Sequence, residues 1–332
     1  MAQQLSLHPG PLPRGEGEAR VTQIAGLIRL RKLRKRYGRR EALAGVDLTL
    51  DGRQIVGIVG PDGAGKTTLI RVLVGLLEID AEEAVALGTD LRGDVTAYKA
   101  QVGYVPQAFS LHRDLSVMEN LRFTARLQRQ APEVFARRTA ELLARTGLTA
   151  FADRRAGALS GGMKQKLAVI NALLCQPKLL LLDEPTAGVD VMARAEIRAM
   201  LERERDTALI IMSTSYLDEA EHCDRLVYLD GGRVVAVGTP AELAAGVSLE
   251  LYRAWGDDPR AIAQAARRLP YVDGARATGR FARIEVPRRA TPGAARVLHD
   301  LRQLPGAGVR FAEARPLDME SVLLALARGA AA

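Results

Sequence analysis

The chain has 332 residues, of which 48% are hydrophobic and 26% are charged, a composition that excludes a disordered or fibrous protein. Only 4% are aromatic, which is little material for a nucleic-acid surface built on stacked bases. No apolar run approaches the roughly 18–20 residues that a membrane-spanning helix needs. The net charge of +8 is local, because eight positive side chains lie between Arg29 and Arg40 and the residues after 40 are in balance.

The amino-terminal part of the chain is predicted to be an extension followed by a basic segment. Residues 1–27 are rich in Pro, Gly and Gln, show no apolar period, and predict a flexible extension without the features of a secretory signal. The basic segment at residues 29–40 can face nucleic acid or lipid headgroups, or it can be a solvated strand and loop, which we favour. Cys175 and Cys223 form no metal-binding spacing with the histidines, so buried thiols and a cytoplasmic location are expected.

Residues 28–245 predict an α/β domain with a largely parallel sheet, because short apolar strands alternate with helical stretches. Gln54–Val59 and Lys178–Leu182 are continuous apolar runs, as expected of strands that are covered on both faces. Between them, residues from about 111 to 174 are helical in period and composition. We therefore expect a helical subdomain inserted into the α/β domain.

Residues 246–332 predict a small α+β accessory domain of the split βαβ type. Strands and helices are expected to alternate in it. The expected strands are Ser248–Trp255, Phe281–Val286 and Val309–Ala314, and the expected helices are Pro259–Leu269, Thr291–Leu304 and Leu317–Ala327.

A glycine-rich loop follows the first of the apolar strands and precedes the helical stretch Leu69–Leu76. Its glycines let successive backbone N–H groups point at phosphates, and the following helix adds the positive end of its dipole. Lys66 would reach the β- and γ-phosphates, and the Thr67 hydroxyl would coordinate Mg²⁺. A glycine-rich turn with a chance lysine is the alternative. The loop fits the full pattern G-x-x-x-x-G-K-[ST] through Gly60, Pro61, Asp62, Gly63, Ala64, Gly65, Lys66, Thr67 and Thr68.

Two carboxylates, Asp183 and Glu184, follow the second apolar strand. The carboxyl ends of parallel strands are where ligands bind in such folds. Asp183 is then placed to hold Mg²⁺, and Glu184 to polarise the attacking water. A strand that ends in a charged turn is the alternative, and the phosphate loop makes it the weaker one.

A third motif precedes this strand, and it is typical of one protein family. It consists of Leu159, Ser160, Gly161, Gly162 and Met163. With it, residues 28–245 resemble the ATP-binding subunits of ABC transporters, whose signature sequence is LSGG. Three further residues match the family's pattern: Gln107 of the Q-loop, Asp190 of the D-loop, and Tyr37 at the position of the aromatic that stacks on adenine.

The resemblance implies a P-loop NTPase core of the ABC ATPase type that binds ATP and Mg²⁺, with Thr67, Gln107 and Asp183 as metal ligands. It also implies that two cassettes pair head to tail. Each ATP then lies between the phosphate loop of one chain and the signature, Ser160–Gly162, of the other. In the family, Gln107 links the nucleotide to the helical subdomain that receives the membrane partner.

The chain departs from the family at Ser215, where a histidine is usual. Serine is shorter and neutral, and we expect it not to bridge the phosphate and Glu184. Loss of a positioned proton-handling group typically removes on the order of 10²–10⁴ in rate. The hypothesis is a slow site on this chain, with an intact signature that serves another cassette. His222 is expected along the next helix and is not a substitute.

Two segments point to exporters in particular. Ser213–Glu221 resembles the first cassette of tandem ATPase subunits in multidrug exporters with ABC-2-type membrane components. Arg315–Val322 resembles the tail of daunorubicin-resistance exporter subunits, although a helix that packs an apolar face through Val322, Leu323 and Leu326 is an equal interpretation. Dimer contact or regulation would suit such a tail.

The implied protein is an exporter ATPase that lies peripherally on the cytoplasmic face of the cell membrane. Its partners would be separate integral membrane ABC-2-type permease subunits and a second ATP-binding cassette, in a homodimer or a heterodimer; no nucleic acid is expected. The alternatives are an ABC-type ATPase that acts on ribosomes or DNA, and a regulatory ATP-binding subunit without useful hydrolysis.

Overall fold

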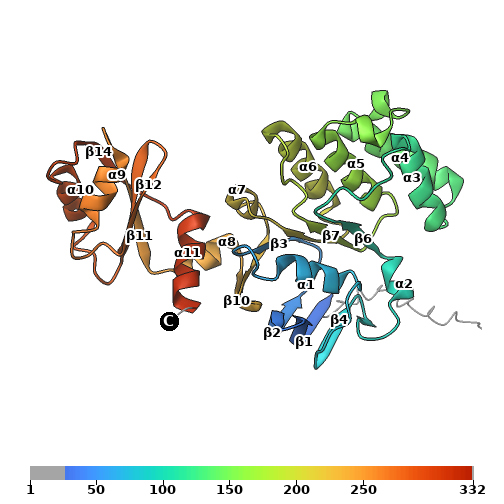
Figure 1. Ribbon diagram of the computed structural model, residues 1–332, viewed down its shortest axis with the longest axis horizontal. Helices are drawn as coiled ribbons and strands as arrows, with labels where there is room; N and C mark the ends of the chain where they lie inside the picture. The colour runs from blue at the N-terminus through green and yellow to red at the C-terminus, as the bar shows by residue number, and fades with distance from the viewer. Residues whose placement is uncertain (1–26, 331–332) are drawn as a thin grey trace, which may run out of the picture.

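The computed structural model describes residues 27–330, and the expected flexible extension therefore lies outside the described residues except for Leu27. The chain forms a larger lobe (residues 27–247) and a smaller lobe (residues 249–315), with the last helix at their junction (Figure 1). Among the helices of residues 27–330, none combines the length and the apolar composition that a membrane crossing requires.

A six-stranded sheet forms the centre of the larger lobe, in the order β10-β9-β3-β8-β7-β6. All pairings are parallel except that of β10 with β9, which confirms the predicted sheet type. Every residue of the three central strands β3, β8 and β7 is buried, as expected for strands covered on both faces. The strands are β3 (Ile55–Val59), β6 (Val102–Val105), β7 (Leu179–Asp183), β8 (Leu209–Ser213), β9 (Arg225–Asp230) and β10 (Arg233–Gly238).

A second, antiparallel sheet contains the basic segment. Its order is β2-β1-β4-β5, and helix α1 (Lys66–Leu73) lies between the two sheets in one apolar core. Along β1 the leucines at 30 and 33 are buried, whereas the charged side chains are exposed or half-buried. The basic segment is therefore a solvated strand, and four of its eight basic side chains are paired with carboxylates. The ion pairs are Arg29–Glu83, Arg31–Glu82, Lys32–Asp47 and Arg34–Glu41, and the elements are β1 (Ile28–Tyr37), β2 (Arg40–Leu50), β4 (Glu83–Ala86), β5 (Thr89–Asp90) and the short helix α2 (Thr96–Lys99).

The predicted helical subdomain is present between β6 and β7. Ser116 caps its first helix: the hydroxyl accepts from the Glu119 backbone N–H, and the Glu119 carboxylate accepts from that of Ser116. Helix α6 (Val191–Glu204) follows β7 and packs against the subdomain. The subdomain contains α3 (Val117–Leu127), α4 (Pro132–Thr146), the 3-10 turns η1 (Thr149–Phe151) and η2 (Ala156–Ala158), and α5 (Gly161–Leu173).

Both cysteines are free thiols in the larger lobe. Cys223 is buried, and burial raises the pKa of its thiol to about 12. Cys175 is half-buried, and burial also raises the pKa of its thiol. Neither thiol therefore has the acidity of a reactive cysteine.

The smaller lobe is the split βαβ unit that the sequence predicts. Its antiparallel sheet has the order β12-β13-β11-β14, and two helices cover one face. Strand β12 (Gly274–Thr278) was not predicted, because its residues GARAT contain no large apolar side chain; pairing with β13 holds it. The other elements are β11 (Leu249–Gly256), α9 (Pro259–Ala266), β13 (Phe281–Pro287), α10 (Ala294–Arg302) and β14 (Val309–Arg315).

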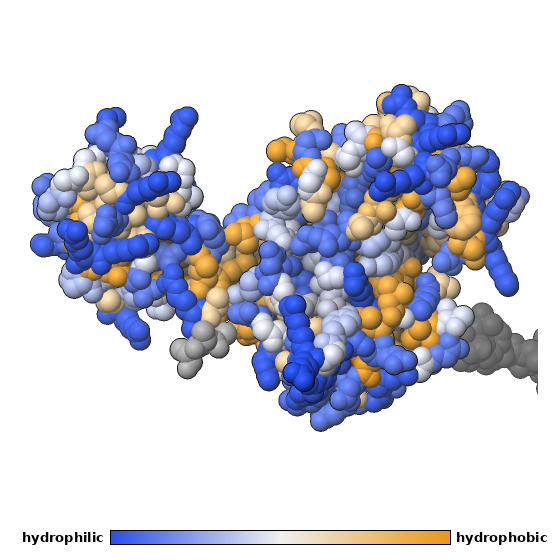
Figure 2. Space-filling view, viewed as in Figure 1, coloured by the Kyte–Doolittle hydropathy of each residue, from blue (hydrophilic) through white to orange (hydrophobic). Residues whose placement is uncertain are grey.

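The last helix, α11 (Met319–Ala330), packs its apolar side on the larger lobe rather than on the unit that precedes it in the chain. Met319, Val322 and Leu323 join the core that lies under the six-stranded sheet. Their neighbours are α7 (Leu217–Ala220) and α8 (Pro240–Gly246). Figure 2 shows hydrophobic surface gathered at this junction of the lobes. The apolar-face interpretation of this segment is thus confirmed, with a helix that begins two residues later than predicted.

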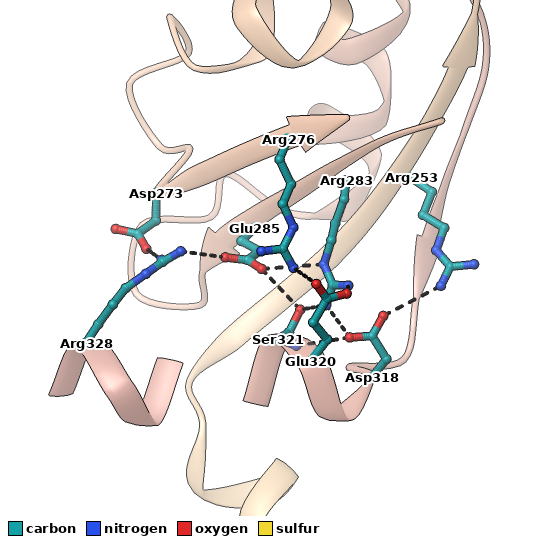
Figure 3. A network of polar contacts seen from close by, with 9 residues as sticks. All are labelled: Arg253, Asp273, Arg276, Arg283, Glu285, Asp318, Glu320, Ser321 and Arg328. Carbon is teal, nitrogen blue, oxygen red and sulfur yellow. Dashed lines mark hydrogen bonds and ion pairs between the residues drawn. The ribbon is translucent and has the colours of Figure 1, made fainter. Parts of the chain in front are cut away.

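The polar side of α11 binds the sheet of the smaller lobe (Figure 3). Arg283 on β13 is only 3% exposed and pairs with Asp318 and with Glu320, the latter at 2.6 Å. Glu285, also buried, accepts from Ser321 at 3.2 Å and from an α11 arginine at 3.1 Å. Helix α11 is therefore fixed to both lobes.

Substitution Arg283→Met is expected to destabilise the smaller lobe by about 3 kcal/mol, because it removes a buried cation that pairs with the buried Glu285 and with the partly exposed Asp318 and Glu320. Unfolding in urea can be followed by the fluorescence of Trp255, the chain's single tryptophan, which lies in this lobe. The matched control is Arg310→Met, whose ion pair with Asp257 is exposed and is expected to be worth less than about 1 kcal/mol. Equal losses in the two variants would contradict the assignment.

Candidate functional site

The phosphate loop, residues 60–68, connects β3 to α1 in a conformation that requires glycine. A Cβ atom on Gly60 would collide with the carbonyl oxygen of Leu229. Gly65 has φ of 107°, and a Cβ there would lie 2.5 Å from the carbonyl oxygen of Ala42. The loop can therefore adopt this conformation only with glycines at these positions.

A pocket of about 450 Å³ opens over this loop. Lys66 is buried in it, and its ammonium group donates to the carbonyl oxygens of Gly60 at 2.8 Å and Pro61 at 3.2 Å. Tyr37, 45% exposed, lies at the end of β1 on the rim of the pocket. The lining residues are Tyr37, Arg40, Ala42, Asp62, Gly63, Ala64, Gly65, Lys66, Thr67, Thr68, Gln107 and Glu184.

Asp183, the last residue of β7, is fully buried beside the loop. Its Oδ1 accepts hydrogen bonds from the hydroxyls of Thr67 at 3.0 Å and Ser213 at 2.8 Å. Its Oδ2 is also buried but has no hydrogen-bond partner within residues 27–330. A buried carboxylate oxygen without a donor, next to a threonine hydroxyl, fits the oxygen ligands that Mg²⁺ requires.

Glu184, Gln107 and Ser215 form a connected group at the edge of the pocket. The Ser215 hydroxyl donates to Glu184 Oε1 at 2.9 Å, and the Gln107 amide donates to Oε2 at 3.0 Å. Ser215 thus reaches Glu184, and the expectation that it does not bridge Glu184 and the phosphate stays a prediction. His222 is exposed, interacts with Arg198, and does not line the pocket.

The signature residues lie away from this pocket, and none of the five is among its lining residues in the described part of the chain. Ser160 is the N-cap of α5, and its hydroxyl accepts from the Met163 backbone N–H at 3.3 Å. Ser160 and Gly161 are exposed, whereas Leu159 is buried and anchors the turn. The turn is thus presented to the outside of the molecule.

The D-loop position is next to this turn. Asp190 caps α6 by accepting from the Ala193 backbone N–H at 2.9 Å. A Cβ on Gly162 would lie 2.9 Å from that of Ala193, so the two helix starts pack closely. The residues that follow Asp190, Val191 and Met192, are large and apolar but are 69% and 72% exposed.

Two polar residues of the site were not predicted from the sequence. Arg40 lines the pocket and donates to the Gly63 carbonyl at 3.2 Å, although it was counted only as part of the basic segment. Ser213 binds Asp183, and its place at the carboxyl end of a central strand was a signal that could have identified it.

Comparison with known proteins gives a consistent set of relatives. The family model described as "ABC transporter" matches residues 43–187. The "Probable multidrug ABC transporter ATP-binding protein YbhF" of Escherichia coli is 42% identical over 272 residues, which are 80% of this chain and 47% of that protein, so the chain spans about half its length. The "Nod factor export ATP-binding protein I" of Ralstonia nicotianae is 33% identical over 328 residues, 96% of each chain.

Relatives with other names match a smaller part of the chain. The "Sulfate/thiosulfate import ATP-binding protein CysA" of Burkholderia mallei is 41% identical over 220 residues, 64% of this chain and 62% of that protein. Among solved structures, a "Dimeric structure of a post-hydrolysis state of the ATP-binding cassette MJ0796 bound to ADP and Pi" has a TM-score of 0.60 and 25% identity. It covers 64% of this chain and 98% of that chain.

Proposed function

Because the chain belongs to the ABC transporter family as an ATP-binding subunit with the P-loop ATPase fold, we propose that it powers an exporter by hydrolysing ATP between two cassettes. The observation that carries the proposal is the division of the motifs between two surfaces. The phosphate loop and both carboxylates surround one pocket, whereas the signature turn is exposed elsewhere. A complete site then needs the signature of a second cassette.

In the proposed site, the residues of the pocket divide binding and chemistry between them. The backbone N–H groups of residues 60–68 and the Lys66 ammonium hold the phosphates, and Tyr37 stacks on adenine. Thr67 and Asp183 hold Mg²⁺, with Gln107 as a third ligand through its amide oxygen, since its nitrogen binds Glu184. When bound, Mg²⁺ neutralises part of the phosphate charge. Glu184 orients the attacking water and accepts its proton.

The second cassette would bind over the pocket through Ser160–Gly162 at the start of α5. The free N–H groups of a helix start attract an anion, and the exposed serine and glycine leave room for a γ-phosphate. The exposed apolar side chains of Val191 and Met192 suit burial in the same interface. Either a copy of this chain or a different cassette satisfies these requirements.

Export is the proposed direction, with ABC-2-type permease subunits as the membrane partners. Of the relatives named above, the one that matches 96% of this chain, accessory domain included, is named for export. The import protein matches over 64% of the chain. The accessory domain is thus shared with a relative named for export, and we propose a regulatory or dimer-contact role for it.

An affinity pull-down from detergent-solubilised membranes tests this function. We expect integral membrane subunits to co-purify with the tagged chain, together with any different cassette. Recovery of ribosomes or DNA in their place would favour the nucleic-acid alternative. The serine at position 215 favours a second candidate function, that of a regulatory ATP-binding subunit. Single-turnover hydrolysis, measured on the chain with each recovered partner, distinguishes this subunit from a working ATPase.

A further inference from the structure

Ser213 lies at the point where three strands of the central sheet end. It is the last residue of β8, which lies between β3, the strand before the phosphate loop, and β7, the strand that ends in Asp183. The register places Ser213 beside Asp183 on one side and beside Ile58 on the other. The rest of β8, residues 209–212, is entirely buried and apolar, so Ser213 is its one polar side chain.

The hydroxyl of Ser213 is fully buried and makes two hydrogen bonds with different neighbours. It donates to Asp183 Oδ1 at 2.8 Å and accepts from the backbone N–H of Glu184 at 2.9 Å. Both distances are those of well-formed hydrogen bonds. A hydroxyl in such surroundings is costly unless it is bonded, and here both its proton and a lone pair are used.

The bond to Asp183 determines how the carboxylate is oriented. Thr67 and Ser213 both donate to Oδ1, which leaves the buried Oδ2 without a protein partner. Without Ser213, one of the two donors that fix this orientation is lost, and the carboxylate can rotate about its last bond.

The bond from Glu184 supports an unusual backbone conformation. Glu184 has φ of 49°, in the left-handed region that side chains with a Cβ rarely adopt. Such a conformation persists only where its surroundings hold it, and the Ser213 hydroxyl is the acceptor for the N–H group of this residue. The direction of the Glu184 side chain therefore depends on Ser213.

We propose that Ser213 is a positioning residue whose single hydroxyl fixes the orientation of Asp183 and Glu184 relative to each other. The metal-binding and water-activating carboxylates then keep a fixed relation to the phosphate loop. The proposal rests on the proposed ATPase site, and it assigns to the end of β8 a role separate from that of Ser215 two residues later.

The test compares metal binding with nucleotide binding in Ser213→Ala. Mn²⁺ is titrated into the chain with a non-hydrolysable ATP analogue and followed by electron paramagnetic resonance; analogue affinity is measured separately in EDTA. We expect Mn²⁺ affinity to fall about 10-fold or more, as for loss of a hydrogen bond to a charged group, with metal-free analogue affinity within about twofold. Turnover should fall while the KM for ATP is unchanged.

The matched control is Thr146→Ala, which removes another buried hydroxyl, bonded to the Leu142 carbonyl in α4, far from the pocket. It should lower the melting temperature as Ser213→Ala does without changing Mn²⁺ affinity. Unchanged Mn²⁺ affinity in Ser213→Ala would overturn the proposal. If that variant does not fold, Ser213→Cys, a weak hydrogen-bonding replacement of similar size, is subject to the same comparison. Failure of the unmodified chain to bind the analogue would instead refute the proposed function.

Discussion

Substitution Glu184→Gln is expected to lower steady-state ATP turnover by about 10²–10³, with ATP affinity within a factor of about two. Glutamine keeps the size of the side chain and can still contact Gln107 and Ser215, but it cannot accept a proton from water. Asp183, the other carboxylate beside the loop, is fully buried and fixed by two hydroxyl donors, so it does not replace Glu184 as a base. Phosphate release measures turnover, and equilibrium binding measures affinity.

The same variant should also accumulate with ATP bound between two cassettes, because hydrolysis no longer separates them. Sedimentation with Mg²⁺ and ATP is expected to show a larger species than sedimentation without nucleotide. The matched control is Asp218→Asn on α7, an exposed carboxylate that does not line the pocket. If Glu184→Gln hydrolyses ATP as fast as this control, another residue must activate the water.

The parts of the fold that were predicted correctly are those in which local pattern and tertiary environment agree. Strands β3 and β7 are continuous apolar runs because both of their faces are covered, and they were located to within one residue. The phosphate loop carries its own glycine requirement in its sequence. In both cases the prediction needs no information about residues far away in the chain.

The parts that were missed depend on partners far away in the chain. Strand β12 has a weak pattern and exists through its pairing with β13. Helix α11 has a clear apolar side, but the sequence does not say that α7 and α8 cover it rather than the neighbouring sheet. Ser213 is an ordinary serine until the register of β7 and β8 places it beside Asp183.

The position of α11 also connects the accessory domain to the region of the candidate site. The backbone N–H of Met319 donates to Glu221 at 3.4 Å, and α7 begins two residues after Ser215. The other side of α11 is held by the buried pair of Arg283 and Glu285. Helix α11 is therefore packed against both lobes.

The hydrogen bonds around Ser215 give a physical reason for the hypothesis that this site hydrolyses ATP slowly. Both oxygens of Glu184 accept from neutral groups, the Ser215 hydroxyl and the Gln107 amide. Neither donor changes its protonation state near neutral pH or carries a charge that could stabilise a phosphate. Thr214, the residue before Ser215, is buried and donates to Glu219 at 2.6 Å, which fixes the loop. The loop is thus well positioned, but Ser215 provides neither a group that takes up a proton nor a positive charge.

Substitution Ser215→His is therefore expected to raise turnover by about 10²-fold, the low end of the effect of a positioned proton-handling group. The larger side chain begins from a loop already held by Thr214 and has room, because position 215 is exposed. The gain should depend on pH with an inflection near the ordinary histidine pKa of about 6.5, which the unmodified chain lacks. Phosphate release, followed between about pH 5.5 and 8.5, measures both the gain in turnover and its dependence on pH.

Ser215→Asn separates the chemistry of histidine from its reach, because asparagine extends further than serine but does not titrate. We expect Ser215→Asn to stay near the unmodified rate. The gain from histidine should also vanish in combination with Glu184→Gln, since an imidazole that assists the water-activating carboxylate has nothing to assist without it. If histidine and asparagine give the same rate, the serine does not limit this site, and the slow-site hypothesis is wrong.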